Sequence, residues 1–153
     1  MDKLLVGERL LLTIWVGGML AIGYMVAPTL FATLDDRQLA GMLAGKMFKI
    51  IYVVGLGATA ILLLGLIINQ GKSLIKEWRS WILIIAFVLI VIGFFVLQPA
   101  MQDLKAQGLL EGSEQAAQFA QLHRLSSTLY TVTSLCGLVL VIFGLRKKDM
   151  AAL

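Results

Sequence analysis

The sequence predicts an all-α polytopic membrane protein, a bundle of four transmembrane helices made of two helical hairpins. Four long apolar runs carry this prediction, at about residues 10–31, 48–68, 81–99 and 124–145. A hydrocarbon core of about 30 Å takes roughly 17 to 25 apolar residues in a helix. Only helices and closed barrels satisfy their backbone polar groups there, and these runs are continuous rather than alternating, so helices are expected.

Length and composition leave room for little besides these spans. The chain has 153 residues, of which 59% are hydrophobic and 14% are charged, and its net charge is +4. We therefore expect residues 1–153 to form a single four-span domain. The basic residues flank the spans, which indicates a role in membrane orientation and argues against nucleic acid as a partner.

The first run is expected to be a retained helix that ends near a proline. Lys3 and Arg9 precede it as in a secretory signal, but the apolar region of a signal has about 7 to 15 residues, and three further spans follow here. Pro28 lies near the end of the run. Its missing N–H and the restricted residue before it favour a kink or a stop.

The second and fourth runs each follow an amphipathic lead-in, at about residues 36–47 and 114–123. Asp35, with Gln38 three residues on, and Ser113 after Gly112 are the expected N-caps. With their lead-ins, both helices would exceed about thirty residues and project beyond the acyl region.

The third run lies between aromatic anchors and a second proline. Trp78 and Trp81 mark one membrane interface, and Pro99 closes the other end. Residues 28–48 and 99–119 share the same spacing of proline and phenylalanine, which indicates a repeat. Parallel repeats of this kind place a site between the two halves, and the alignment sets Tyr52 opposite His123.

Basic residues predict the orientation of the chain. Eight lie with the termini and the middle loop: Lys3, Arg9, Lys72, Lys76, Arg79, Arg146, Lys147 and Lys148. Five lie on the other side: Arg37, Lys46, Lys49, Lys105 and Arg124. The positive-inside rule then places both termini in the cytoplasm.

Small residues at helical spacing offer close helix contacts. Gly41 and Gly45 are four residues apart, as are Gly17 and Ala21. Three glycines interrupt the second span: Gly55, Gly57 and Gly65. Such residues let backbones approach closely. We expect contacts within one bundle, while a homo-oligomer or another membrane protein stays open as a partner besides the lipid bilayer.

The fourth span carries a polar stripe. At 100° per residue, its members fall within an arc of about 140°. They are His123, Ser126, Ser127, Tyr130, Thr131 and Ser134. A polar stripe in a bilayer either holds helices together or lines a wet cleft.

His123 is the only histidine, and its role stays open between a structural group, a proton relay and a ligand for a metal or haem. Met25, Met47 and Met101 could complete a soft Cu(I) site with it, or simply fill apolar space. No Asp or Glu falls within a span to add a ligand. The metal site is therefore unknown.

Lys46 and Lys49 lie about one turn apart where the second helix enters the bilayer. Their side chains either snorkel to headgroups or, with His123 and Arg124, form an anion-attracting mouth to a cleft. Motifs of soluble enzymes such as GxSxG, CxxC and HExxH are missing from the sequence. No catalytic residue is assigned, and an enzyme is the less favoured class.

Two stretches resemble a known family. The first holds Trp15-Val-Gly-Gly-Met and Val26-Ala-Pro-Thr-Leu-Phe31, and the second is Phe119-Ala-Gln-Leu-His-Arg-Leu-Ser126. Together they resemble the bacterial integral-membrane family called domain of unknown function 4149. That family is similar to eukaryotic transmembrane protein 205. More distantly, it looks like copper-resistance D membrane proteins and the haem-associated protoporphyrinogen oxidase of the J type.

This resemblance implies a multi-pass protein of the bacterial inner membrane with unsettled activity. The distant relatives imply haem or copper as a cofactor, with His123 as the one candidate ligand that can be carried over.

The leading functional hypothesis is a polar cleft, facing outward, that binds or helps to transport a small solute or metal ion. The candidate lining is Tyr24, Lys46, Tyr52, Gln98, His123, Ser127 and Tyr130. The alternatives are a structural or assembly partner of another membrane protein, and a haem-associated redox membrane protein.

Overall fold

A computed structural model describes residues 3–110 and 112–144, and this part of the chain is entirely helical with short connections. The first hairpin comprises α1 (Lys3–Ala21), η1 (Ile22–Val26), α2 (Ala27–Thr33) and α3 (Arg37–Gln70). A 3-10 segment, η2 (Gly71–Lys76), leads into the second hairpin. That hairpin comprises α4 (Trp78–Ile92), η3 (Gly93–Leu97), α5 (Gln98–Gln107) and α6 (Glu114–Phe143).

Four stretches are long and apolar enough to cross a membrane: Leu4–Thr33, Arg37–Asn69, Trp78–Gln107 and Glu114–Phe143. The predicted all-α fold with four spans is confirmed. The amphipathic lead-ins are continuous with the second and fourth spans, because α3 has 34 residues and α6 has 30.

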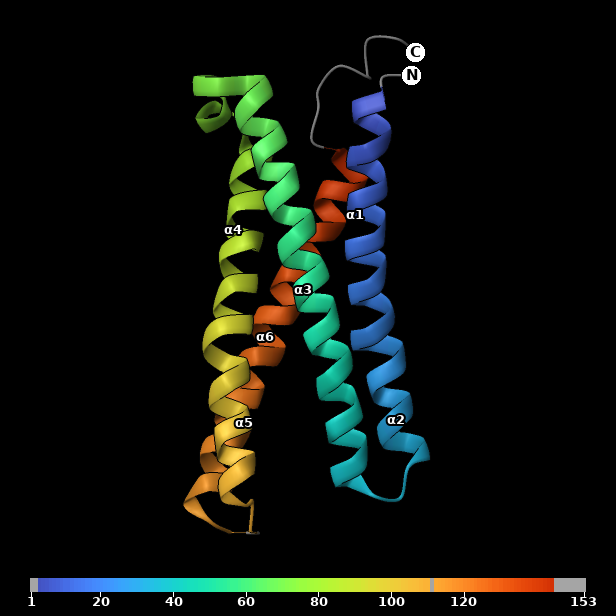
Figure 1. Cartoon of the computed structure of the whole chain (residues 1–153), viewed down its shortest axis with the longest axis vertical. Coiled ribbons are helices and arrows are strands. Elements are labelled where there is room, and N and C mark those ends of the chain that lie inside the picture. The colour runs from blue at the N-terminus through green and yellow to red at the C-terminus, as the bar shows by residue number, and fades with distance from the viewer. Residues whose placement is uncertain (1–2, 111, 145–153) are drawn as a thin grey trace.

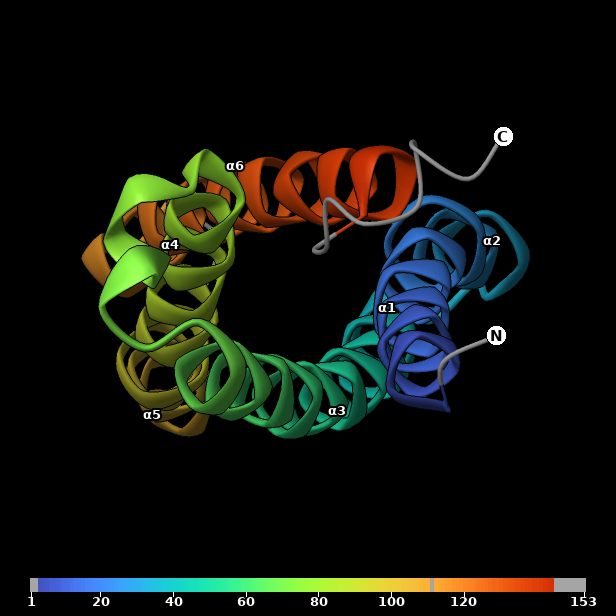
Figure 2. The ribbon, with the colours of Figure 1, turned by 90° about the horizontal axis from the view of Figure 1, so that it is seen from above.

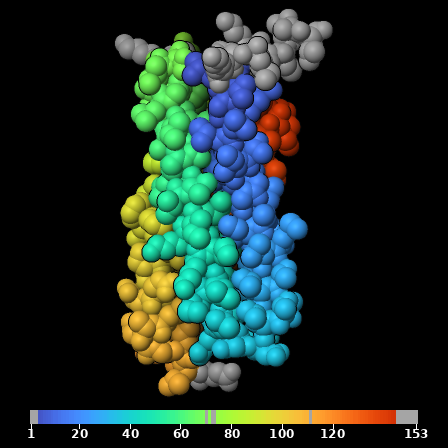
Figure 3. Space-filling model, turned by 45° about the vertical axis from the view of Figure 1, so that its right-hand side comes forward, coloured from blue at the N-terminus to red at the C-terminus, as the bar shows by residue number. Residues whose placement is uncertain are grey.

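The four spans form a ring. α1 packs against α3 and α6, and α4 packs against the same two helices. Figure 1 shows the first residues of α1 and the last residues of α6 at the same end of the bundle, and Figure 2 shows the ring from above. Figure 3 shows α1, α3 and α4 packed side by side along the long axis. The tail residues used for orientation, Arg146, Lys147 and Lys148, lie outside the described residues.

Neither proline stops its helix. Each is preceded by a π-helical turn, η1 before Pro28 and η3 before Pro99, and α2 and α5 continue beyond them. Each proline comes six positions after the first residue of its π turn. A proline has no N–H to donate and crowds the carbonyl four residues back, and a wider turn accommodates both effects.

One of the two predicted N-caps is wrong by one residue. Asp36, not Asp35, caps α3, because its carboxylate accepts from the backbone N–H groups of Gln38 and Leu39 at 2.8 and 3.1 Å. Asp35 lies one position too early, since the helix begins at Arg37. Ser113 caps α6 as predicted, with its hydroxyl accepting from the N–H of Ala116 at 3.1 Å.

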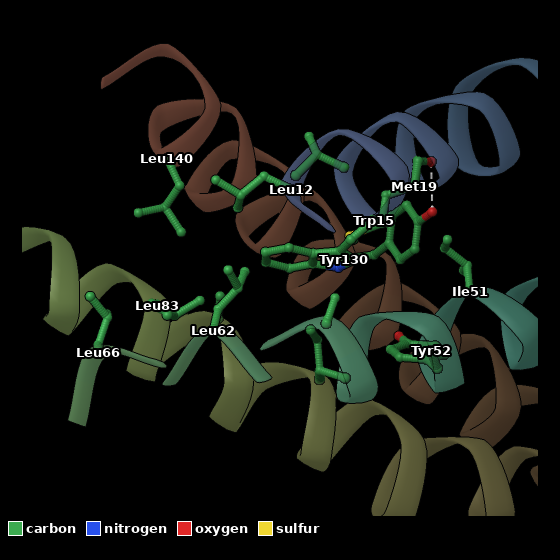
Figure 4. Close-up of a cluster of buried hydrophobic side chains, with 14 residues drawn as sticks. Leu12, Trp15, Met19, Ile51, Tyr52, Leu62, Leu66, Leu83, Tyr130 and Leu140 are labelled. Carbon is green, nitrogen blue, oxygen red and sulfur yellow. Dashed lines mark hydrogen bonds between the residues drawn. The ribbon is translucent and has the colours of Figure 1, made fainter. Parts of the chain in front are cut away.

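The core lies in the half of the bundle nearer the termini. Trp15, Leu83 and Leu140 are fully buried there and come from three different spans, as Figure 4 shows. The indole N–H of Trp15 has no hydrogen-bond partner among the described residues. Gly55 makes room for this ring, because a Cβ there would lie 2.9 Å from the indole nitrogen.

The other predicted glycine contacts divide into two groups. A Cβ on Gly45 would lie 3.9 Å from the amide nitrogen of Gln102 on α5, and one on Gly41 would lie 3.8 Å from Phe31 on α2. These contacts lie within the bundle, as expected. A Cβ on Gly17 or Gly57 would meet nothing within 4 Å among the described residues.

Candidate ligand-binding cleft

A pocket of about 1250 Å³ lies between the two hairpins. Its lining comes from η1, α2 and α3 on one side and from η3, α5 and α6 on the other. In Figure 1, α2 and α5 lie in the lower half of the bundle, away from the termini, beside the lower parts of α3 and α6. The pocket therefore lies at the interface between the two halves that the spacing of the prolines predicts.

All seven residues predicted for the cleft line this one pocket. They are Tyr24, Lys46, Tyr52, Gln98, His123, Ser127 and Tyr130. They come from four different elements, η1, α3, α5 and α6, so only the fold brings them together. Their role in binding a ligand stays a prediction.

The two π turns form opposite walls of the pocket. Gly23 and Tyr24 of η1 line one side, and Phe94 and Phe95 of η3 line the other. These pairs are 71 positions apart, the same offset that relates the two prolines. π-helical turns occur frequently at functional sites, where they redirect side chains. Here they turn equivalent residues of both halves toward one space.

An aromatic cluster centred on Tyr130 closes the deep end of the pocket. Phe48 and Tyr52 make edge contacts with its ring at centroid distances of 5.1 and 6.3 Å, and Tyr24 lies at 6.5 Å. Tyr52 and Tyr130 are buried, and the Tyr52 hydroxyl lies beside the side chain of Ser126. The floor is thus largely aromatic, with hydroxyl groups at its edge.

The polar stripe of α6 satisfies most of its hydrogen bonds within its own helix. Ser127 donates to the carbonyl of His123, and Thr131 donates to that of Ser127, both at 2.9 Å. Ser134 donates to the carbonyl of Tyr130, also at 2.9 Å. Such bonds cover the donors while the hydroxyl oxygens can still accept. The stripe therefore does little to hold helices together, apart from Tyr130.

The stripe divides by depth. Ser126, Tyr130 and Ser134 are buried in the bundle, whereas His123, Ser127 and Thr131 are exposed. The exposed three still line the pocket, which places them on its open wall. The ring of His123 is stacked on Phe119, with centroids 6.0 Å apart and an angle of 11° between the planes.

Four basic side chains line the pocket: Arg37, Lys46, Lys49 and Lys105. Arg37 and Lys105 were not predicted as cleft residues, because in the sequence both resemble ordinary loop or flanking charges. Arg124 was expected at the mouth with His123 but is not among the lining residues. A neighbouring position on a helix is turned by about 100°, so the two side chains point in different directions.

The candidate metal ligands do not gather at one place. Met101 is buried and lines the pocket with His123, whereas Met25 and Met47 are exposed and are not among its lining residues. The described residues hold no group of three or more His, Cys, Asp or Glu side chains that could bind a metal ion. A metal site in the cleft therefore stays a prediction with two candidate ligands, His123 and Met101.

Fold and pocket together define a multi-pass membrane protein with a cleft between two similar helical hairpins. Residues 10–109 match the family model described as Domain of unknown function (DUF4149), and the chain belongs to that family. No curated protein and no solved structure matches the chain. The expected likeness to transmembrane protein 205 and to copper-resistance D proteins stays a prediction.

Proposed function

We propose that the protein binds a small solute in the cleft between its hairpins and thereby transports it or assists its transport. The supporting observation is the convergence of seven polar residues, from four elements, on one pocket of about 1250 Å³. Ligand pockets typically measure roughly 300 to 1000 Å³ and combine apolar walls with a few polar groups. This pocket is slightly larger and has the same character.

We also propose that the protein resides in the bacterial inner membrane with both termini in the cytoplasm. In this orientation the cleft opens on the side of the membrane away from the cytoplasm. The excess of basic residues near the termini supports this orientation. A solute is favoured over a metal ion, because the described residues lack a cluster of metal-binding side chains.

The first test asks whether water reaches the cleft. Ser127→Cys and Thr128→Cys are made in a Cys136→Ala background, which removes the only native thiol. Both positions are exposed, but only Ser127 lines the pocket. A thiol reacts as its thiolate, which forms in water and not in lipid. We expect a charged, membrane-impermeant methanethiosulfonate to label Ser127→Cys and to leave Thr128→Cys largely unlabelled.

The side from which the reagent acts tests the orientation. Labelling of Ser127→Cys in intact cells would support an outward opening, and labelling only after permeabilisation would reverse it. If neither position reacts under either condition, the cleft is not hydrated and the proposed function fails.

One observation supports the alternative role as a structural or assembly partner of another membrane protein. Gly17 and Gly57 are exposed and have open space in front of them among the described residues. Exposed small residues on membrane helices let a second helix approach closely. A pull-down in mild detergent that yields only the monomer would count against this role.

A further inference from the structure

The charges that line the cleft are unbalanced. The described lining residues include four basic side chains, Arg37, Lys46, Lys49 and Lys105, and no acidic one. When charges of one sign line a cleft with low-dielectric walls, their electric field is focused there, and positive charges therefore attract anions into the cleft. Within a membrane, such charges are costly unless something pairs with them. The lining therefore favours a ligand that carries negative charge.

Basic residues of both hairpins lie within about one helical turn of a contact between α3 and α5. Gly45 on α3 and Gln102 on α5 face each other, since a Cβ on Gly45 would lie 3.9 Å from the amide nitrogen of Gln102. Lys46 directly follows Gly45, and Lys105 lies about one turn beyond Gln102. The Lys105 ammonium is also held 5.4 Å from the centroid of the Phe119 ring. An anionic group between α3 and α5 would have cations on both sides.

The rest of the lining suits an apolar chain. Five phenylalanines and three tyrosines line the pocket: Phe31, Phe48, Phe94, Phe95, Phe119, Tyr24, Tyr52 and Tyr130. Basic side chains near the contact between α3 and α5, together with an aromatic floor, match a molecule with a charged head and an apolar body.

The wall of the cleft is also open toward the surroundings of the bundle. Phe31 and Met42 are each 48% exposed and Phe95 is 61% exposed, although all three line the pocket. All three side chains lie on stretches that are long and apolar enough to cross a membrane, and we expect the exposed face of Phe95, which is farthest from the ends of its stretch, to meet lipid. An amphiphile could enter sideways from the bilayer without passing through water.

We infer that the cleft binds an anionic amphiphile, with a phosphate or carboxylate head between Lys46 and Lys105 and its apolar chain on the aromatic floor. This inference rests on the proposed function and specifies its ligand class. The head could belong to a bilayer phospholipid or to a free amphiphilic anion. Both sources share the same chemistry, and the experiment separates them.

The experiment compares lipids of equal chain length by native mass spectrometry. The full chain in a neutral detergent is incubated with phosphatidylglycerol or with phosphatidylcholine, and the fraction carrying one bound lipid is measured. We expect the anionic lipid to be preferred. Lys46→Gln and Lys105→Gln should each reduce that preference by about fivefold, the effect of one basic residue near an anionic lipid. Arg124→Gln is the matched control, because this exposed cation on α6 does not line the pocket and should change little.

Two further arms identify the source of the anion. Decyl phosphate and an excess of inorganic phosphate are each added as competitors of bound phosphatidylglycerol. We expect decyl phosphate to displace the lipid and inorganic phosphate to leave it bound, because the apolar chain contributes to binding. Displacement by decyl phosphate supports a free amphiphile as a ligand, and failure of both to compete supports the bilayer lipid. If inorganic phosphate displaced the lipid as well as decyl phosphate does, the inference that the ligand is an amphiphile would be wrong.

The failure of this inference differs from the failure of the proposed function. Equal binding of both lipids, or an equal effect of Arg124→Gln and Lys46→Gln, would contradict the inference that the cleft binds an anionic ligand. If Ser127→Cys is labelled in that case, the hydrated cleft survives and its ligand is of another class. Circular dichroism and gel filtration of each variant keep a folding defect from being mistaken for lost binding.

Discussion

The hydroxyl of Tyr130 on α6 donates a hydrogen bond of 2.7 Å to the carbonyl oxygen of Met19 on α1, as Figure 4 shows. Met19 lies shortly before the π turn η1, and the Tyr130 ring packs against Gly23 within that turn. A buried tyrosine needs a partner for its O–H, and a helix carbonyl has a second lone pair to offer. This bond joins helices of the two hairpins at the deep end of the cleft.

Tyr130→Phe should destabilise the bundle by about 0.5–1.5 kcal/mol, because it removes this bond while keeping the ring. Unfolding by sodium dodecyl sulfate in mixed micelles measures the free energy. Tyr24→Phe is the matched control, since the Tyr24 ring contacts the same cluster but is 49% exposed. Equal losses in the two variants would show that the bond to Met19 has no special weight.

Asp36→Ala should destabilise the protein by about 0.5–2 kcal/mol, the usual cost of an N-cap, because two backbone N–H groups of α3 lose their acceptor. Asp35→Ala removes the same charge one residue earlier and should have little effect. The midpoints of thermal unfolding in detergent compare the two variants. A larger loss for Asp35→Ala would place the start of the helix one residue earlier than in this structure.

The number and type of spans could be predicted from the sequence because bilayer thickness alone fixes the length of an apolar helix. The first and last residues of the helices could not be predicted with the same precision. Neighbouring carboxylates at 35 and 36 both suit an N-cap, and only the backbone geometry selects Asp36. Pro99 left two possibilities open, since a proline signals a stop or a kink equally well, and α5 continues beyond it to Gln107.

The polar face of the cleft could be predicted because its residues break an otherwise apolar pattern. His123 and Ser127 stand out in a membrane helix for this reason. Phe94 and Phe95 could not be found in that way, since phenylalanine is ordinary in a span and only the π turn η3 directs these two residues to the pocket. Lys105 was missed because its approach to the cleft depends on how the hairpins pack.

The gently purified protein should show no Soret band and no stoichiometric copper. A metal needs several ligands at one place, and the described residues bring only His123 and Met101 of the four candidates to the pocket. A visible spectrum and elemental analysis of protein from cells supplied with haem and copper measure both. One equivalent of either, lost in His123→Ala, would instead support the redox alternative.

The π turn η3 depends on a glycine for its contact with α3. A Cβ on Gly93 would lie 2.7 to 2.9 Å from the hydroxyl and ring of Tyr52, and both residues are buried. Gly93→Ala should therefore destabilise the bundle by about 1–3 kcal/mol, the usual cost of overpacking, and move the Tyr52 ring within the cleft. Unfolding in mixed micelles measures the loss of stability.

Gly57→Ala is the matched control for Gly93→Ala. Gly57 lies within α3, and a Cβ there would meet nothing within 4 Å among the described residues. This variant should stabilise the helix by up to about 1 kcal/mol, because alanine loses less backbone entropy than glycine. Opposite signs for the two variants are the expected result. Stabilisation by both would mean that Tyr52 does not pack against η3, and the deep end of the cleft would have to be shaped differently.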